Sequence, residues 1–218
     1  SIDTPFDYNG KKYILIDTAG IRHKTKVKSS ADFYGSVRSK EAIERCDIAV
    51  ILLDGNDGLR EDDEKTVDLV LKNFKALIIA VNKWDLVKGL EMSKYEDMLV
   101  EKMKMLRNFP IIFISSKTGR NVRDSLGLAG FVYKNFTRVI PAQELAETLK
   151  MLNASVEIAA KRLKFKSLTQ VQGAMPPGFI FYVNNPRLLS DNLKRYVENF
   201  MRKAHDFKGV PIAIKFNK

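Results

Sequence analysis

The segment Tyr13–Gly20 (YILIDTAG) is the part of the sequence from which the fold follows most directly. An aromatic residue and three branched apolar residues end abruptly at Asp17, and Gly20 follows. This pattern is typical of a buried parallel strand that carries polar groups at its carboxyl end. Open α/β sheets bind ligands at that end, so we expect a ligand site next to Asp17.

The same pattern occurs twice downstream. An apolar run over 78–81 ends at Asn82–Asp85 (NKWD), and another over 111–114 ends at Ser115–Lys117 (SSK). We therefore predict three strands of one mostly parallel sheet, with their polar ends at one edge. The continuous apolar run Asp47–Asp54 predicts a central strand. Helical patterns alternate with these strands, which indicates an α/β fold.

Local signals define two further features of this part. Asn9-Gly10 follows Phe6–Tyr8 and precedes a strand, so we predict an antiparallel hairpin at a sheet edge. The acidic run Glu61–Glu64 lies where a helix begins, and we interpret it as helix capping in preference to a metal site. The single cysteine, Cys46, excludes an intramolecular disulfide and is interpreted as a small core residue, not a reactive thiol.

Length and composition favour a folded protein without a membrane span. The chain has 218 residues, of which 45% are hydrophobic, enough for a real core. No apolar run reaches the roughly 18 residues of a membrane helix, and the start of the chain lacks the pattern of a signal peptide. We expect a soluble, cytoplasmic protein with no membrane partner.

Positive charge is concentrated in the last third of the chain. Residues 1–138 carry 24 Lys and Arg against 20 Asp and Glu, whereas residues 139–218 carry 13 against 6. This excess predicts binding to a polyanion, in particular nucleic acid, although a solubilising surface is the alternative. The helix, strand, strand, helix, strand order over 139–218 predicts a small α+β domain after a larger domain over 1–138.

The NKWD sequence carries chemistry specific for guanine. The Asp85 carboxylate can accept hydrogen bonds from both N1–H and the exocyclic amino group of guanine, which adenine does not offer. The Lys83 stem can cover the ring, and Asn82 can tie adjacent loops together. Backbone amides of Ser115–Lys117 can reach the base oxygen. These residues predict a guanine-nucleotide site.

The segment around Asp17 suits the other end of the nucleotide. Asp17 can contact a magnesium ion through water, and the backbone amide of Gly20 can approach a terminal phosphate. His23 follows in a polar, basic loop; because the sequence offers it no partner, we do not assign it as a general base.

Several motifs together resemble one family. Asp17–Arg22 (DTAGIR), Asn82–Asp85, Ile114–Gly119 (ISSKTG), Pro177–Asn184 (PGFIFYVN) and Gly209–Ile212 (GVPI) are similar to the double-G-domain GTPases of the Der (EngA) family, over essentially all of the chain. The resemblance implies a P-loop-GTPase-like sheet, N-terminally truncated, over 1–138, corresponding to a second G domain. It implies a KH-like domain over 139–218.

The resemblance also implies a function. Proteins of this family hydrolyse GTP and assist assembly of the large ribosomal subunit, so GTP or GDP and Mg²⁺ would be cofactors, and rRNA and an upstream first G domain would be partners. The GTP-binding residues would be Asp17, Thr18, Ala19, Gly20, Ile21, Asn82, Lys83, Trp84, Asp85, Ser115, Ser116 and Lys117. Ile21 stands where many GTPases have a water-positioning glutamine, so no catalytic residue is assigned.

Two family features are missing from the sequence. The phosphate-binding pattern Gly-x-x-x-x-Gly-Lys-[Ser/Thr] and the first switch do not occur, so we expect this chain alone to hold GTP poorly and to belong to a longer protein. The KH-like part lacks a Gly-x-x-Gly loop.

The KH-like part could instead contact RNA through basic residues that alternate with apolar ones. These residues could form a basic strand face or protect a strand edge; they are Lys161, Arg162, Lys164 and Lys166. The alternative function for the whole chain is a non-hydrolysing RNA- or ribosome-binding module with a degenerate G domain.

Overall fold

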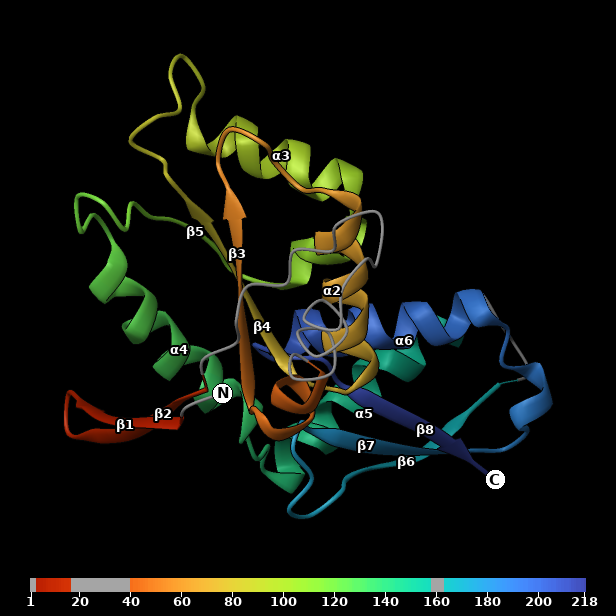
Figure 1. Cartoon of the computed structure of the whole chain (residues 1–218). Helices are drawn as coiled ribbons and strands as arrows, with labels where there is room; N and C mark the ends of the chain where they lie inside the picture. Colours follow the sequence, from red (N-terminus) through yellow and green to blue (C-terminus); the bar gives the residue numbers. More distant parts are fainter. Residues whose placement is uncertain (1–2, 17–39, 158–162) are drawn as a thin grey trace. The chain divides into compact units, whose positions relative to one another are not determined.

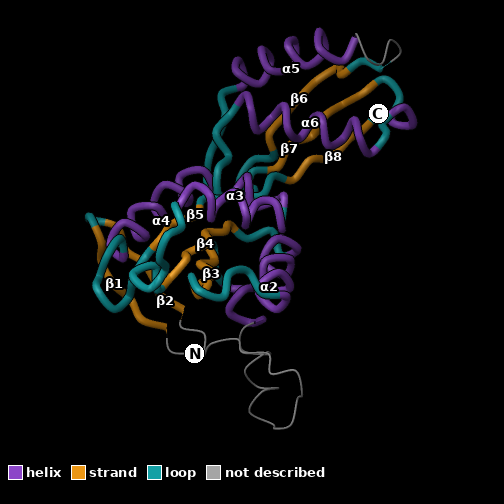
Figure 2. Tube along the Cα trace, turned by 90° about the horizontal axis from the view of Figure 1, so that it is seen from above, coloured by secondary structure: helices purple, strands orange, loops and turns teal. Residues whose placement is uncertain are grey.

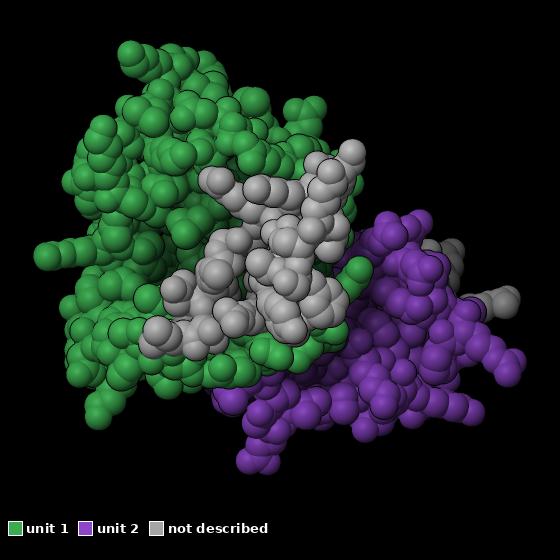
Figure 3. Space-filling model, viewed as in Figure 1, with its two compact units in different colours: residues 1–133 green, residues 134–218 purple. Residues whose placement is uncertain are grey.

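The computed structural model describes residues 3–16, 40–157 and 163–218. The chain divides into two compact units, unit 1 (Ser1–Tyr133) and unit 2 (Lys134–Lys218), coloured green and purple in Figure 3. The division lies five residues before the predicted boundary at 138, within helix α4 (Val122–Phe136).

Unit 1 starts with an antiparallel hairpin of β1 (Asp3–Tyr8) and β2 (Lys11–Ile16). The two turn residues, Asn9 and Gly10, have φ values of 50° and 73°, as a tight two-residue hairpin turn requires. The predicted hairpin is therefore confirmed. The hydroxyl of Tyr8 donates a hydrogen bond to the carbonyl of Arg123 (3.3 Å), which connects the hairpin to α4.

Three parallel strands in the order β3-β4-β5 form the second sheet of unit 1 (Figure 1). Helices follow β3 and β4, which confirms the predicted α/β alternation. Residues 40–45, before β3, are helical. The elements are β3 (Ile48–Asp54), α2 (Glu61–Lys72), β4 (Ala76–Asn82), α3 (Met92–Lys102), the 3₁₀ turn η1 (Lys104–Asn108), β5 (Ile111–Phe113) and α4.

The core of unit 1 lies between this sheet and helices α2 and α3. Alternate side chains of β3 and β4 point into it, because successive residues of a strand face opposite sides. All residues from Ala76 to Val81 in β4 are fully buried, which explains their uninterrupted apolar run. The main members of the cluster are Ile51, Leu53, Val67, Val70, Leu77, Ile79, Val81, Leu99 and Leu106.

Two predictions about the sheets of unit 1 are wrong. β2, predicted to lie in the parallel sheet, pairs with β1 and with none of the three parallel strands; its Ile14 and Leu15 are 67% and 58% exposed. β3, predicted to be central, is at an edge of the described sheet, and its Val50 and Leu52 are exposed. An apolar run indicates a strand, but its neighbours depend on contacts distant in sequence, which local patterns do not encode.

Unit 2 is a three-stranded sheet with two long helices along it, visible in Figures 1 and 2. β6 pairs with β7 antiparallel, and β7 pairs with β8 parallel. This confirms the predicted small α+β domain. The elements are α5 (Ala142–Glu157), β6 (Phe165–Gln170), β7 (Gly178–Val183), the 3₁₀ turn η2 (Pro186–Leu188), α6 (Asp191–Ala204) and β8 (Ala213–Asn217).

Local chemistry sets several element ends in both units. Ser190 caps α6 by accepting a hydrogen bond from the N–H of Leu193 (3.3 Å), so the helix begins at Asp191. In α2, the Asp63 carboxylate accepts from the backbone N–H of Arg60 (2.9 Å), which confirms the capping interpretation of the acidic run.

Cys46 is half-buried, and its thiol donates to the carbonyl of Ile43 (3.4 Å). Burial raises the pKa of this thiol, which favours its neutral, unreactive form. Within the ranges that the structure describes, no helix is both long and apolar enough to cross a bilayer.

Candidate functional site

Asn82 connects the two loops that the sequence placed around guanine. It is the last residue of β4, and its side-chain oxygen accepts hydrogen bonds from the backbone N–H (3.0 Å) and the hydroxyl (3.1 Å) of Ser116. The loops after β4 and β5 are adjacent because these strands are parallel neighbours. The role predicted for Asn82, tying adjacent loops together, is confirmed.

Lys83 forms an ion pair that the sequence did not predict. Its ammonium lies 2.6 Å from a carboxylate oxygen of Asp54, the last residue of β3. Asp54 lies opposite Asn82 in the parallel register, which places the carboxylate next to the start of the NKWD loop. The hydrogen bond from Lys83 and that from the backbone N–H of Asn56 lower the pKa of the Asp54 carboxyl. The signal was present in the sequence, since the run Asp47–Asp54 also ends in a carboxylate.

Trp84 is buried in the core of unit 1. It is 7% exposed, and its ring centroid lies 4.5 Å from that of Phe113 and 5.3 Å from that of Tyr95. Its backbone N–H donates to the carbonyl of Ile114 (3.1 Å). The buried indole therefore anchors the loop in the core, whereas the side chains of its sequence neighbours, Lys83 and Asp85, are exposed.

The remaining predicted contacts of unit 1 differ in exposure. Asp85, Ser116 and Lys117 are exposed, whereas Ser115 is fully buried. The Ser115 hydroxyl accepts from the backbone N–H of Thr118 (3.2 Å), so this side chain shapes the loop. No described side chain pairs with the Asp85 carboxylate, which leaves both of its oxygens free to accept hydrogen bonds from a base.

The predicted phosphate and magnesium contacts lie outside the described residues. This group comprises Asp17, Thr18, Ala19, Gly20 and Ile21, and His23 lies there too. Lys161 and Arg162 are also outside, whereas Lys164 and Lys166 are exposed on and next to β6, an edge strand of its sheet. In the described part of the chain, no group of three His, Cys, Asp or Glu side chains could hold a metal ion.

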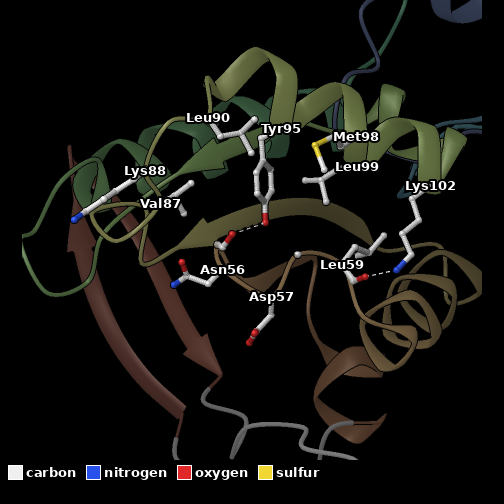
Figure 4. A pocket seen from close by; sticks show the side chains of 12 residues that line it. Asn56, Asp57, Leu59, Val87, Lys88, Leu90, Tyr95, Met98, Leu99 and Lys102 are labelled. Carbon is white, nitrogen blue, oxygen red and sulfur yellow. Dashed lines mark hydrogen bonds between the residues drawn. The ribbon is translucent and has the colours of Figure 1, made fainter.

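A groove of about 460 Å³ lies beside the NKWD loop (Figure 4). Its walls come from the turn after β3, the loop before α3, and α3 itself. The Tyr95 hydroxyl donates to the carbonyl of Gly55 (3.0 Å), and Lys102 donates to the carbonyl of Leu59. None of the predicted guanine contacts lines this groove.

The arrangement suits recognition of one base edge and one ring face. Asp85 offers two free acceptor oxygens, and Lys83 is held close by through Asp54. Of the three backbone amides predicted to reach the base oxygen, those of Ser115 and Ser116 instead donate to the carbonyl of Arg120 (3.1 Å) and the side chain of Asn82 (3.0 Å). The backbone N–H of Lys117, in the exposed loop after β5, could meet an exocyclic oxygen. Guanine presents this combination of two donors and one acceptor, and adenine does not.

Two family models match the chain. One is the elongation factor Tu GTP-binding domain, which matches residues 2–161. The other is the KH-domain-like, C-terminal part of EngA bacterial GTPases, which matches residues 140–217. The two matches together cover almost the whole chain.

Curated relatives and one solved structure are also similar to the chain. The chain is 36% identical to the GTPase Der of Chlorobium chlorochromatii over 99% of its length, and 37% identical to that of Chlorobium phaeobacteroides over 100%. It spans about half the length of these relatives, 50% and 51%. A structure of Era in complex with MgGDPNP and nucleotides of 16S ribosomal RNA shares the fold, with a TM-score of 0.53 at 16% identity, covering 98% of this chain and 78% of Era.

Proposed function

Because the chain belongs to the GTPase Der (EngA) family, we propose that it is the C-terminal half of a GTP-binding and GTP-hydrolysing switch protein. The observation that carries this proposal is the arrangement of the NKWD loop. Asn82 ties the loop to Ser116 (3.0 Å), Trp84 anchors it in the core, and Asp85 remains exposed and unpaired among the described residues. This combination leaves the Asp85 carboxylate ready to accept two hydrogen bonds from guanine.

We propose that the protein is longer than this chain and that the additional part supplies the phosphate-binding loop and a first G domain. Asp17 would hold Mg²⁺ through water, and Gly20 would contact the terminal phosphate. The longer protein would act in the cytoplasm.

Binding of fluorescently labelled GDP to the full-length protein, with Mg²⁺ present, tests the nucleotide assignment. We expect GDP to bind and ADP to compete weakly. Asp85→Asn should weaken guanine binding and favour xanthine nucleotides, because an amide can donate to the C2 oxygen of xanthine. Asp97→Asn, which alters an exposed carboxylate on α3, is the matched control and should behave like wild type. Equal binding of GDP and ADP would leave only the alternative of a non-hydrolysing RNA-binding module.

We propose that unit 2 contacts rRNA during assembly of the large ribosomal subunit. The basic excess over 139–218 supports this, and Lys164 and Lys166 are exposed on the edge of the sheet. Such contacts neutralise phosphates and release counterions, so affinity should fall steeply with salt.

The double variant Lys164→Gln/Lys166→Gln tests the RNA contact in the full-length protein. We expect lower rRNA affinity and a salt dependence reduced by up to about two phosphate contacts. The control is Lys72→Gln/Lys104→Gln, which removes the same charge from exposed positions of unit 1. Unchanged rRNA affinity in the first variant would show that the two lysines only protect a strand edge.

A further inference from the structure

Asp54 lies next to the NKWD loop and belongs neither to the family motifs nor to the predicted contacts. It ends β3, lies opposite Asn82 in the sheet, and places one carboxylate oxygen 2.6 Å from the ammonium of Lys83. We propose that Asp54 is a positioning residue that holds Lys83 beside the guanine base and away from Asp85. This inference rests on the proposed function, since it concerns the same nucleotide site.

The two oxygens of Asp54 have separate partners, which fixes the carboxylate. One oxygen accepts from the backbone N–H of Asn56 (3.0 Å), and the other binds Lys83. The backbone carbonyl of Asp54 accepts from the N–H groups of Asp57 (3.1 Å) and Gly58 (3.0 Å), closing the turn after β3. The Asp54 side chain is only 26% exposed, so Lys83 is held by a group with little freedom of its own.

Backbone hydrogen bonds join this turn to the NKWD loop. The N–H of Gly55 donates to the carbonyl of Asn82 (2.8 Å), and the carbonyl of Gly55 accepts from the buried Tyr95 hydroxyl (3.0 Å). A Cβ at Gly55 would lie 2.9 Å from the Asn82 oxygen, so the two segments are as close as their backbones allow. The fold therefore fixes the backbones that carry Asp54 and Lys83 next to each other.

Lys83 needs such a partner for two reasons. Its side chain is long, flexible and 55% exposed, so an unpaired ammonium would sample many positions. The second reason is that Asp85 lies only two residues away in sequence. Without Asp54, the nearest acidic neighbour in sequence is Asp85, and an ion pair between Lys83 and Asp85 would occupy the carboxylate that guanine requires.

The test compares labelled GDP binding to the full-length wild-type protein and to Asp54→Asn. Asparagine keeps an oxygen for the Asn56 N–H and loses the charge that holds Lys83. We expect a loss of affinity of about two- to fivefold, the range for a partly exposed ion pair. Asp57→Asn, in the same turn but paired with Arg60, should retain wild-type affinity. Asp54→Glu should recover part of the loss because the charge is restored.

A double-mutant cycle separates positioning from a purely structural role. In a Lys83→Met background, Asp54→Asn should cause no further loss of GDP affinity, because no ammonium remains to be positioned. Additive losses, or wild-type affinity of Asp54→Asn, would overturn the inference and leave the proposed function intact. Failure of the wild-type protein to bind GDP would instead overturn the proposed function.

Discussion

Tyr95→Phe removes the hydroxyl group that supports the turn next to the NKWD loop and keeps the aromatic ring. The Tyr95 hydroxyl donates to the carbonyl of Gly55 (3.0 Å), and the ring contacts Trp84 edge-on at 5.3 Å. Phenylalanine retains the ring contacts and leaves the Gly55 carbonyl without its donor. The variant therefore isolates the energetic contribution of a single buried hydrogen bond.

The size of the effect follows from the surroundings of Gly55. A buried acceptor left without a partner costs about 1–3 kcal/mol. Gly55 and the Tyr95 hydroxyl are both buried, so water does not readily replace the lost hydrogen bond. We therefore expect a decrease of about 1–3 kcal/mol in the free energy of unfolding of unit 1.

Urea unfolding of the 218-residue chain, followed by tryptophan fluorescence, measures this quantity. Trp84 is the only tryptophan, and its contact with Tyr95 makes its emission report on unit 1. Tyr95→Leu is the comparison variant, and it should lose about 0.5–1.5 kcal/mol more because the ring contacts disappear as well. If Tyr95→Phe unfolds at the wild-type urea concentration or higher, the hydrogen bond does not support the loop and the reasoning fails.

The same residue gives an expectation for alkaline pH. Burial raises the pKa of Tyr95 above its ordinary value of 10.0. The unfolded chain then ionises at a lower pH than the folded chain, so wild-type stability falls as pH rises above about 10. Tyr95→Phe should show a smaller fall over the same range.

Three further variants test the packing of both units. In Gly55→Ala, the new methyl group would lie 2.9 Å from the Asn82 oxygen. We expect this variant to destabilise unit 1 by about 1–3 kcal/mol in urea unfolding and to weaken GDP binding by the full-length protein. Wild-type values in both assays would contradict this. Burial lowers the pKa of His205 below its ordinary 6.5, so the unfolded chain binds a proton first and stability should fall as pH drops below about 6.5. In melts followed by circular dichroism, His205→Gln should show a flatter dependence of stability on pH than wild type. Equal pH profiles would refute this role of His205. The Asn153 side chain donates to the carbonyl (2.9 Å) and accepts from the N–H (3.0 Å) of Phe165, which links α5 to β6. Asn153→Ala should therefore destabilise unit 2 by about 1–3 kcal/mol, measured by hydrogen exchange of β6. Unchanged exchange would exclude this link.

The local pattern of the sequence was enough for the elements and for part of the site. Asn9-Gly10 predicted the first hairpin, because a two-residue turn depends only on the backbone preferences of its own residues. The alternation of apolar runs and helical patterns predicted the α/β order of unit 1. The link between Asn82 and Ser116 was also predictable, since parallel neighbours end at the same edge of a sheet.

Other features required the tertiary structure. The sequence did not show that, among the described strands, β2 pairs with β1 alone and β3 lies at an edge, or that Trp84 points into the core while its neighbours are exposed. It did not show the ion pair of Asp54 with Lys83, which are separated by helix α2 and strand β4.

These features share one physical origin. Turn chemistry and side-chain periodicity act between residues close in sequence, so the sequence by itself determined which segments become strands and helices and which loops carry the groups predicted to contact guanine. The partners of a strand edge, the burial of an indole and the counterion of a lysine depend on residues brought together only when the sheets and helices pack, and only the tertiary structure decided them.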